Sequence, residues 1–365
     1  MTLKLPFLKT AGLGLMASLL STAAIAEVPR VATDIAPVHS LVAMVMGDLG
    51  APALIVRPEA SPHGYAMRPS EAQALSDADL VVWIGEALTP WLEGPLETLA
   101  GGAHKLELMS VEGTVLHDYR EGATFAAHDH GDHEGHDHGD HDDDHDHDDA
   151  HDDDAHDDHG HAHDDDHGHA AEKDDHDHAH GDDHGDEHGD GHDHSGSDAH
   201  AWLDPVNGRL WLGAIAAELS ELDPENAATY AANAAAGQAE LEALEESLRA
   251  DLAGLGEAGF VVFHDAYQYF ERRFGLSASG AISMSDATTP SAGRIAELQE
   301  AVGSMGVACV FSEPQFNAGL INSVFADRAT VGILDPFGFD IAAGPGLYPQ
   351  ILKNMAAEFV GCLAG

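Results

Sequence analysis

Four side chains that can bind a metal lie at the ends of short apolar runs or beside a low-complexity segment. They are three histidines and one aspartate, His63, His200, His264 and Asp335. Neutral imidazoles with a carboxylate or a water form a set of nitrogen and oxygen donors that Zn²⁺ accepts in tetrahedral geometry, whereas Mn²⁺ and Ca²⁺ prefer more oxygen. One histidine at the end of a strand is more often a structural residue, so the prediction of a zinc site depends on these side chains converging.

Two regions of the chain alternate apolar runs with helical patterns, which predicts two lobes of α/β structure with mainly parallel sheets. The expected strands are 31–33, 54–56, 80–84, 260–263, 307–311 and 331–334, and the expected helices include 70–77, capped by Ser70, 293–305 and 349–360. Ligands in open α/β folds bind beyond the carboxyl ends of the strands. His63, His264 and Asp335 each follow a strand, so loops from two facing lobes would bring them to His200 in a cleft.

A long helix is expected between the two lobes. The segment 223–225, Asp-Pro-Glu, is a favourable helix start, and apolar residues then recur at spacings of three and four from Tyr230 to Leu252. Gly237 interrupts this stripe; an interior glycine either costs about 1 kcal/mol relative to alanine or marks close packing against a lobe. The length of the pattern and its position favour a rigid linking helix over 223–254 rather than an ordinary surface helix.

The first 26 residues have the layout of a secretory signal peptide. Lys4 and Lys9 precede a short apolar run over 11–20, and the small residues of 24–26 form a cleavage signature. The apolar run is too short to span a bilayer. We therefore expect cleavage after Ala26 and a soluble periplasmic product.

Histidine, aspartate and glycine make up almost all of the segment 128–194. It holds 22 of the 28 histidines and 29 of the 65 acidic residues, with no aromatic or large aliphatic side chain. Such a segment cannot bury enough apolar surface to offset the entropy of ordering, so it is predicted to be a disordered insertion. It lies inside the first lobe, which spans 27–222, and the second lobe spans 255–365.

Charge and cysteine content narrow the function further. A formal net charge of −50 excludes a nucleic-acid-binding role, which needs lysine and arginine patches, and suits a cation as partner. The only cysteines are Cys309 and Cys362. In an oxidising compartment such a pair readily forms a disulfide, and two buried free thiols are the alternative.

Five motifs together resemble the metal-binding solute-binding proteins of ABC transporters, and specifically their high-affinity zinc-uptake branch. The motifs are Pro62-His63-Gly64-Tyr65 with Arg68-Pro69-Ser70, Ala78-Asp79-Leu80-Val81-Val82-Trp83-Ile84-Gly85, His200-Ala201-Trp202-Leu203-Asp204-Pro205, Phe263-His264-Asp265-Ala266-Tyr267-Gln268-Tyr269-Phe270-Glu271, and Ser312-Glu313-Pro314-Gln315-Phe316. The resemblance covers nearly the whole mature chain apart from the insertion. It implies two α/β lobes joined by one long rigid helix, with the metal between them.

The resemblance also implies the ligands and the partners. It assigns His63, His200 and His264 as metal ligands, and the third position is usually a carboxylate in the manganese branch, so His264 points to zinc. The implied partners are a permease in the inner membrane and its cytoplasmic ATPase. We expect a monomer that binds Zn²⁺ and no nucleic acid, and that is not an enzyme.

The fourth ligand stays open at this point. Some zinc-branch members have a carboxylate directly before the first ligand histidine, and this chain has Pro62 there. The fourth ligand is therefore a water or Asp335, which corresponds to a carboxylate of manganese-type relatives, with Glu313 as a further candidate. Zinc-branch members also carry a disulfide in the second lobe, which a Cys309–Cys362 bridge would match.

The insertion suggests an auxiliary role as a low-affinity zinc collector. It contains His-x-His pairs, His136/His138, His145/His147, His161/His163 and His176/His178 among them. A flexible chain of such pairs can hold several ions weakly near the main cleft at high effective concentration. Because zinc binds neutral imidazole, this capacity should fall as the pH drops through about 6.5. The alternative is a solvated acidic segment with incidental metal affinity.

Three other functions compete with zinc import. A zinc hydrolase would also use three histidines and a water, with Asp265 or Glu313 as a base, but the chain has no His-Glu-x-x-His helix and no G-x-S-x-G turn. A periplasmic zinc buffer or chaperone would need the same binding site and no transporter. A manganese or iron importer would share the fold.

Overall fold

The computed structural model describes residues 27–120, 125, 196–256, 258–283, 291–315 and 324–364. The predicted signal peptide, 1–26, and the predicted insertion, 128–194, lie outside the described residues. In the part that is described, no helix is both long and apolar enough to cross a membrane.

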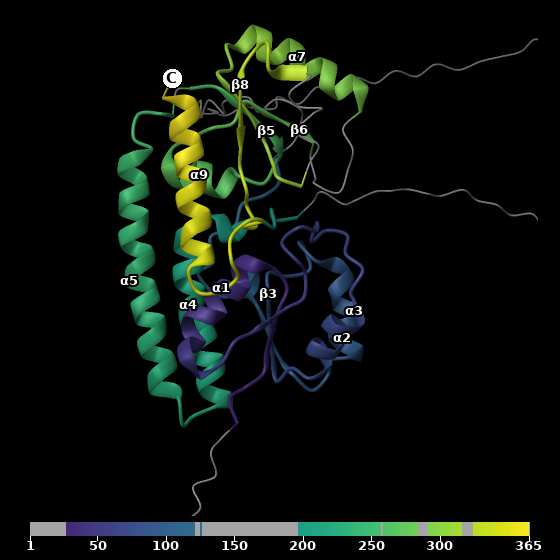
Figure 1. Cartoon of the computed structure of the whole chain (residues 1–365), viewed down its shortest axis with the longest axis vertical. Coiled ribbons are helices and arrows are strands. Elements are labelled where there is room, and N and C mark those ends of the chain that lie inside the picture. Colours follow the sequence, from purple (N-terminus) through teal and green to yellow (C-terminus); the bar gives the residue numbers. More distant parts are fainter. Residues whose placement is uncertain are drawn as a thin grey trace, which may run out of the picture. The chain divides into compact units, whose positions relative to one another are not determined.

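Two four-stranded parallel sheets with the same strand order form the framework (Figure 1). The first contains β1 (Val31–Thr33), β2 (Ala53–Leu54), β3 (Leu80–Trp83) and β4 (His104–Glu107) in the order β2-β1-β3-β4. The second contains β5 (Phe260–His264), β6 (Gly280–Ser283), β7 (Cys309–Ser312) and β8 (Thr330–Ile333) in the order β6-β5-β7-β8. In each sheet the first strand in the chain pairs with the second strand on one side and with the third strand on the other, so the strand order changes direction between the two central strands. The crevice between the carboxyl ends of these two strands is the expected place for a ligand.

Helices connect and cover these strands. The α-helices are α1 (Ala36–Met46), α2 (Pro69–Ser76), α3 (Glu93–Thr98), α4 (Pro205–Leu222), α5 (Ala227–Asp251), α6 (Gln268–Phe274), α7 (Ala292–Met305) and α9 (Leu347–Leu363). Short 3₁₀ turns are η1 (Gly47–Leu49), η2 (Pro90–Leu92), η3 (Leu108–Ser110) and η4 (Ala201–Leu203). The predicted fold class, α/β with parallel sheets and one long helix, is confirmed.

The long helix α5 packs on α1, α4 and α9, and Figure 1 shows it running beside α4 and α9. It begins at Ala227, so the prediction that it starts at Asp223 is wrong. The Asp223 carboxylate instead accepts hydrogen bonds from Asn226 Nδ2 (2.7 Å) and Tyr230 Oη (2.9 Å), which close a separate turn before the helix. Gly237 marks close packing, because a Cβ atom there would lie 2.9 Å from Leu212 Cδ1.

The boundaries of α2 and β2 also differ from prediction. Helix α2 begins at Pro69, so Ser70 lies inside the helix and does not cap it; the Glu71 carboxylate accepts the Arg68 N–H at 2.6 Å instead. Strand β2 ends at Leu54 rather than at residue 56. The chain nevertheless follows β1 further, since the Ile55 N–H donates to the Thr33 carbonyl at 2.9 Å.

One continuous apolar core includes residues of both sheets, among them Val82 in β3 and Phe260 and Phe311 in the second sheet. A disulfide between Cys309 and Cys362 joins the start of β7 to the last turn of α9, with Cα atoms 6.0 Å apart. The two cysteines are therefore not free thiols. The bridge holds the C-terminal helix against the second sheet.

Close packing at Gly208, in α4, yields a stability prediction. A Cβ atom there would lie 2.5 Å from Tyr348 Oη, and the Tyr348 ring is fully buried with its hydroxyl donating to the Trp202 carbonyl at 2.7 Å. We expect Gly208→Ala to lower the free energy of unfolding by about 1–3 kcal/mol through overpacking. Denaturant unfolding monitored by circular dichroism measures this.

The matched control is Gly213→Ala in the same helix, where the nearest atom to a new Cβ is Nε2 of the Gln238 side chain at 3.3 Å. It should be neutral or stabilising by up to about 1 kcal/mol, the ordinary helix-propensity gain. Equal effects of the two substitutions would contradict the packing argument.

Candidate metal centre

His264 is the last residue of β5, and its side chain is completely buried. Its Nδ1 is hydrogen-bonded to Oε1 of Glu313, the residue directly after β7, which is the strand paired with β5. The other oxygen of Glu313 accepts from Gln315 Nε2 at 2.6 Å. Because an ionised carboxylate only accepts hydrogen bonds, the His264 Nδ1 carries the hydrogen and its Nε2 is left as an acceptor.

His200 has the same kind of support from a different carboxylate. It directly precedes η4, and its Nδ1 lies 2.7 Å from Oδ1 of Asp198, which also accepts the His200 backbone N–H at 3.0 Å. Burial alone would raise the pKa of Asp198, but the interaction with His200 and the hydrogen bonds from His200 and Gln268 outweigh it and hold that pKa below its ordinary value. Asp198 therefore stays a carboxylate that orients the ring of His200.

The two oriented rings face each other. The distance from His200 Nε2 to His264 Nε2 is 3.4 Å. Two nitrogens bound to one tetrahedral Zn²⁺ with bonds of about 2.0–2.1 Å lie roughly 3.3 Å apart. Carboxylate–histidine pairs of this kind are also the usual outer support of a histidine metal ligand. The pair thus has the spacing and the orientation of two zinc ligands.

His63 lies next to this pair, in the loop that follows β2. Its ring centroid is 5.7 Å from that of His200, with the planes tilted by 58°. The loop is held by the first lobe, since Trp91 Nε1 donates to the Pro62 carbonyl at 2.7 Å. As the rings stand, no three histidine, cysteine, aspartate or glutamate side chains of the described residues are arranged to hold one metal ion.

The carboxylate of Asp335 is bonded to backbone N–H groups rather than to a histidine ring. Asp335 lies two residues after β8, and its carboxylate accepts backbone N–H groups of Phe337 (3.1 Å), Gly338 (2.8 Å) and Phe339 (2.6 Å). Burial raises the pKa of Asp335, against the lowering effect of these three hydrogen bonds. This turn contacts Trp202, whose Nε1 donates to the Pro336 carbonyl at 2.9 Å.

Trp202 in turn packs on the ring of His200, with centroids 5.2 Å apart. The Asp335 turn is therefore linked to His200 through the Pro336 carbonyl and the Trp202 ring. Its role as a fourth ligand stays a prediction.

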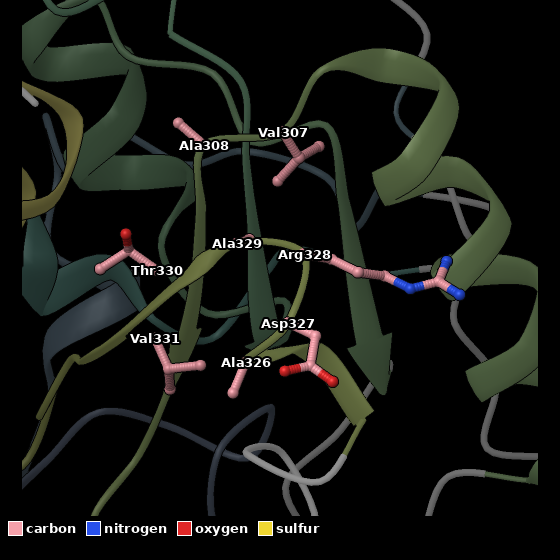
Figure 2. Close-up of a pocket in the computed structure, with 8 residues that line it drawn as sticks. All are labelled: Val307, Ala308, Ala326, Asp327, Arg328, Ala329, Thr330 and Val331. Carbon is pink, nitrogen blue, oxygen red and sulfur yellow. The ribbon is translucent and has the colours of Figure 1, made fainter.

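A hollow beside the second sheet lies away from the histidine site. It has a volume of about 560 Å³ and lies at the amino-terminal ends of β7 and β8, where Val307, Ala308 and residues 326–331 line it (Figure 2). His264 ends the parallel strand β5 at the opposite edge. The geometry of the histidines, rather than an open cavity, identifies the site.

Comparison with known proteins shows the family of this chain. Residues 31–362 match the family model described as "Zinc-uptake complex component A periplasmic", ZnuA. The chain belongs to this family.

Two family relatives and one solved structure show how far the likeness extends. A "High-affinity zinc uptake system protein ZnuA" from Brucella suis is 42% identical over 335 residues, 92% of this chain and 91% of the relative. The protein of that name from Paracoccus denitrificans is 43% identical over 353 residues, 95% of this chain and 97% of the relative. A crystal structure of ZnuA superposes with a TM-score of 0.64 at 22% identity, covering 92% of this chain and 98% of that one, which shows a shared fold.

Sequence reasoning missed the groups that orient the rings of His200 and His264. Asp198 and Gln268 were not singled out, and Glu313 was considered only as a ligand or a base, although its carboxylate is engaged by His264 and Gln315. The short spacing of Asp198 and His200 was a usable local signal. Glu313 follows the strand beside the one that ends at His264, a relation that becomes visible only with the strand order.

The remaining described histidines have other partners. Nε2 of His39 lies 3.1 Å from the Pro52 carbonyl, and the exposed His104 pairs with Glu218. The ring of His117 packs on Tyr269. Burial lowers the pKa of both His39 and His117. Each of these three histidines is therefore held by contacts outside the His200–His264 pair.

The carboxylate contacts predict a definite tautomer for the metal-free protein. We expect ¹⁵N NMR of the imidazoles to show His200 and His264 both protonated at Nδ1, because each Nδ1 faces a carboxylate oxygen. Asp198→Ala should remove this preference at His200 and leave it at His264. A neutral ring with its hydrogen on Nε2 in the unsubstituted protein would contradict the geometry.

Proposed function

We propose that this chain captures Zn²⁺ in the periplasm and delivers it to a membrane importer. The single observation that carries the proposal is the pair of buried Nε2 atoms, on His200 and His264, held 3.4 Å apart by carboxylates on the far side of each ring. Membership of the zinc-uptake component A family supports the same reading. The cation would lie between the two Nε2 atoms and accept a lone pair from each, in place of a proton that the two rings could share.

His63 is proposed as the third ligand. It belongs to the loop beside His200, and a small rotation or shift of that loop would direct its ring to the same ion. Asp335 or a water would complete a tetrahedral set. Three imidazoles favour Zn²⁺ over Mn²⁺, because Mn²⁺ sites are richer in oxygen.

The family is a transport family, described as periplasmic and as one component of a zinc-uptake complex. We propose that the signal peptide 1–26 is cleaved and that the mature protein is a monomer acting with a permease and a cytoplasmic ATPase. The lobes are proposed as 27–222 and 255–365, joined by 223–254, with the metal between them. The segment 128–194 is proposed as an auxiliary zinc collector.

One experiment distinguishes zinc import from simple zinc buffering. A strain lacking this chain should lose uptake of radioactive zinc at low external concentration if the chain serves an importer. Normal uptake combined with greater sensitivity to added zinc would favour a periplasmic buffer.

Alanine substitutions of the three histidines test the binding site. We expect His63→Ala, His200→Ala and His264→Ala each to raise the Kd for zinc by more than about 100-fold, since loss even of an outer partner of a ligand costs about 10–100-fold. Competition against a chromophoric chelator, with less than one equivalent of zinc, measures the tightest site in the full chain.

The control is His104→Ala, which removes an exposed imidazole paired with Glu218 and should leave the Kd unchanged. Full affinity after loss of His200 or His264 would show that the tight site is elsewhere. Tighter binding of Mn²⁺ than of Zn²⁺ by the unsubstituted protein would overturn the choice of metal.

A further inference from the structure

A glutamine from the second half of the chain reaches the carboxylate that orients His200. Gln268 is the first residue of α6, and it is almost completely buried. Its Nε2 donates to Oδ2 of Asp198 at 2.8 Å and to the backbone carbonyl of Asp118 at 2.8 Å. Three side chains thus form a series from Gln268 through Asp198 to the His200 ring.

Asp198 depends on this donor. Its Oδ1 accepts both the backbone N–H and the Nδ1–H of His200, and its Oδ2 accepts from Gln268. The carboxylate is fully buried, where a charged oxygen deprived of its donor is costly. Removal of the Gln268 amide would favour a different orientation of the carboxylate, and the His200 ring would follow.

Helix α6 also holds the backbone on which Asp198 stands. The Tyr269 hydroxyl donates to the Asp198 carbonyl at 2.7 Å and accepts the His117 N–H at 3.1 Å. An isolated antiparallel bridge joins Asp118 to Ser197. Both chain segments that flank the histidine-rich stretch are therefore fastened to α6.

An ion pair network strengthens the same attachment. Arg120 contacts the carboxylates of Asp265 and Glu271, and all three side chains are largely buried. Glu271 lies on α6, and Asp265 directly follows His264. Paired buried charges of this kind are costly to separate, which makes the attachment specific.

The support of His264 is built differently. Its series runs from Gln315 through Glu313 to the His264 ring, and all three residues follow or end strands of the second sheet. The support of His200 instead joins Asp198, in the segment before η4 and α4, to Gln268 on α6, the helix that follows β5. The His200 series therefore depends on contact between the two halves of the chain, whereas the described hydrogen bonds of the His264 series lie within the second half.

We propose that Gln268 is a positioning residue for zinc binding, acting through Asp198 to aim Nε2 of His200 at His264. The inference rests on the proposed zinc-binding function. In a conformation of the protein that lacks the contact between Gln268 on α6 and Asp198, His200 is misaligned and zinc binds more weakly. By linkage, bound zinc strengthens the contact between Gln268 and Asp198 to the same degree.

A double-mutant cycle tests this role. In the full chain, Gln268→Leu should raise the Kd for zinc about tenfold, at the low end of the effect of outer groups on metal sites. In an Asp198→Ala background the same substitution should change the Kd less than twofold, because the residue through which it acts is already gone. Chelator competition gives the four Kd values, and thermal unfolding of each metal-free variant checks the fold.

Gln238→Leu is the matched control, since Gln238 on α5 also donates its Nε2 to a backbone carbonyl, that of Arg209, away from the histidines. It should leave the Kd unchanged. If Gln268→Leu does not fold, Gln268→Glu keeps the side-chain shape, replaces the donor with a carboxylate facing Asp198, and should weaken binding at least as much in the same cycle.

The visible absorption spectrum of bound Co²⁺ is a second readout, and Gln268→Leu should alter it while Gln238→Leu should not. An unchanged Kd in folded Gln268→Leu overturns the inference, as do equal losses in both backgrounds. Absence of tight zinc binding by the unsubstituted chain would instead remove the proposed function itself.

Discussion

Two imidazole nitrogens facing each other at 3.4 Å are the arrangement on which the rest of the site depends. Each ring is fixed from behind by a buried carboxylate, so neither ring can turn its Nδ1 inward without losing a charge-assisted hydrogen bond. Two lone pairs at this distance are unfavourable unless a metal ion lies between them or one Nε2 carries a proton and donates it to the other. The carboxylates add negative charge near the site and increase its attraction for a divalent ion.

The fold supplies the two rings from separate places. His264 and Glu313 lie side by side because β5 pairs with β7, and these are the central strands of the second sheet. His200 stands before α4, which packs with α1 and α5 beside the first sheet. The shared core and the contacts of α6 with Asp198 bring these parts together, so the geometry of the pair depends on the packing of the chain around it as well as on local sequence.

The sequence predicted the class of fold and the candidate ligands, because buried strands are apolar and the histidines stand out at their ends. It did not predict β4 and β6: β4 is a partly exposed, polar edge strand, and β6 is short and begins with glycine. The start of α5 was misplaced because Asp223 makes a turn of its own before the helix.

The groups that orient the two histidine rings were missed for a different reason. Gln268 is 70 residues from Asp198, and nothing in the local pattern of either residue signals their contact. The resemblance to a zinc-uptake family indicated the histidines as a set. It gave no information on which nitrogen of each ring faces the other ring, and that follows only from where Asp198 and Glu313 lie.

The structure of the zinc-loaded protein at high resolution tests the central claim most directly. The account predicts one Zn²⁺ bonded to Nε2 of His200 and Nε2 of His264 at about 2.0–2.1 Å, with the Nδ1 atoms still on Asp198 and Glu313. Coordination through either Nδ1, or a fully occupied zinc that contacts neither ring, would contradict it.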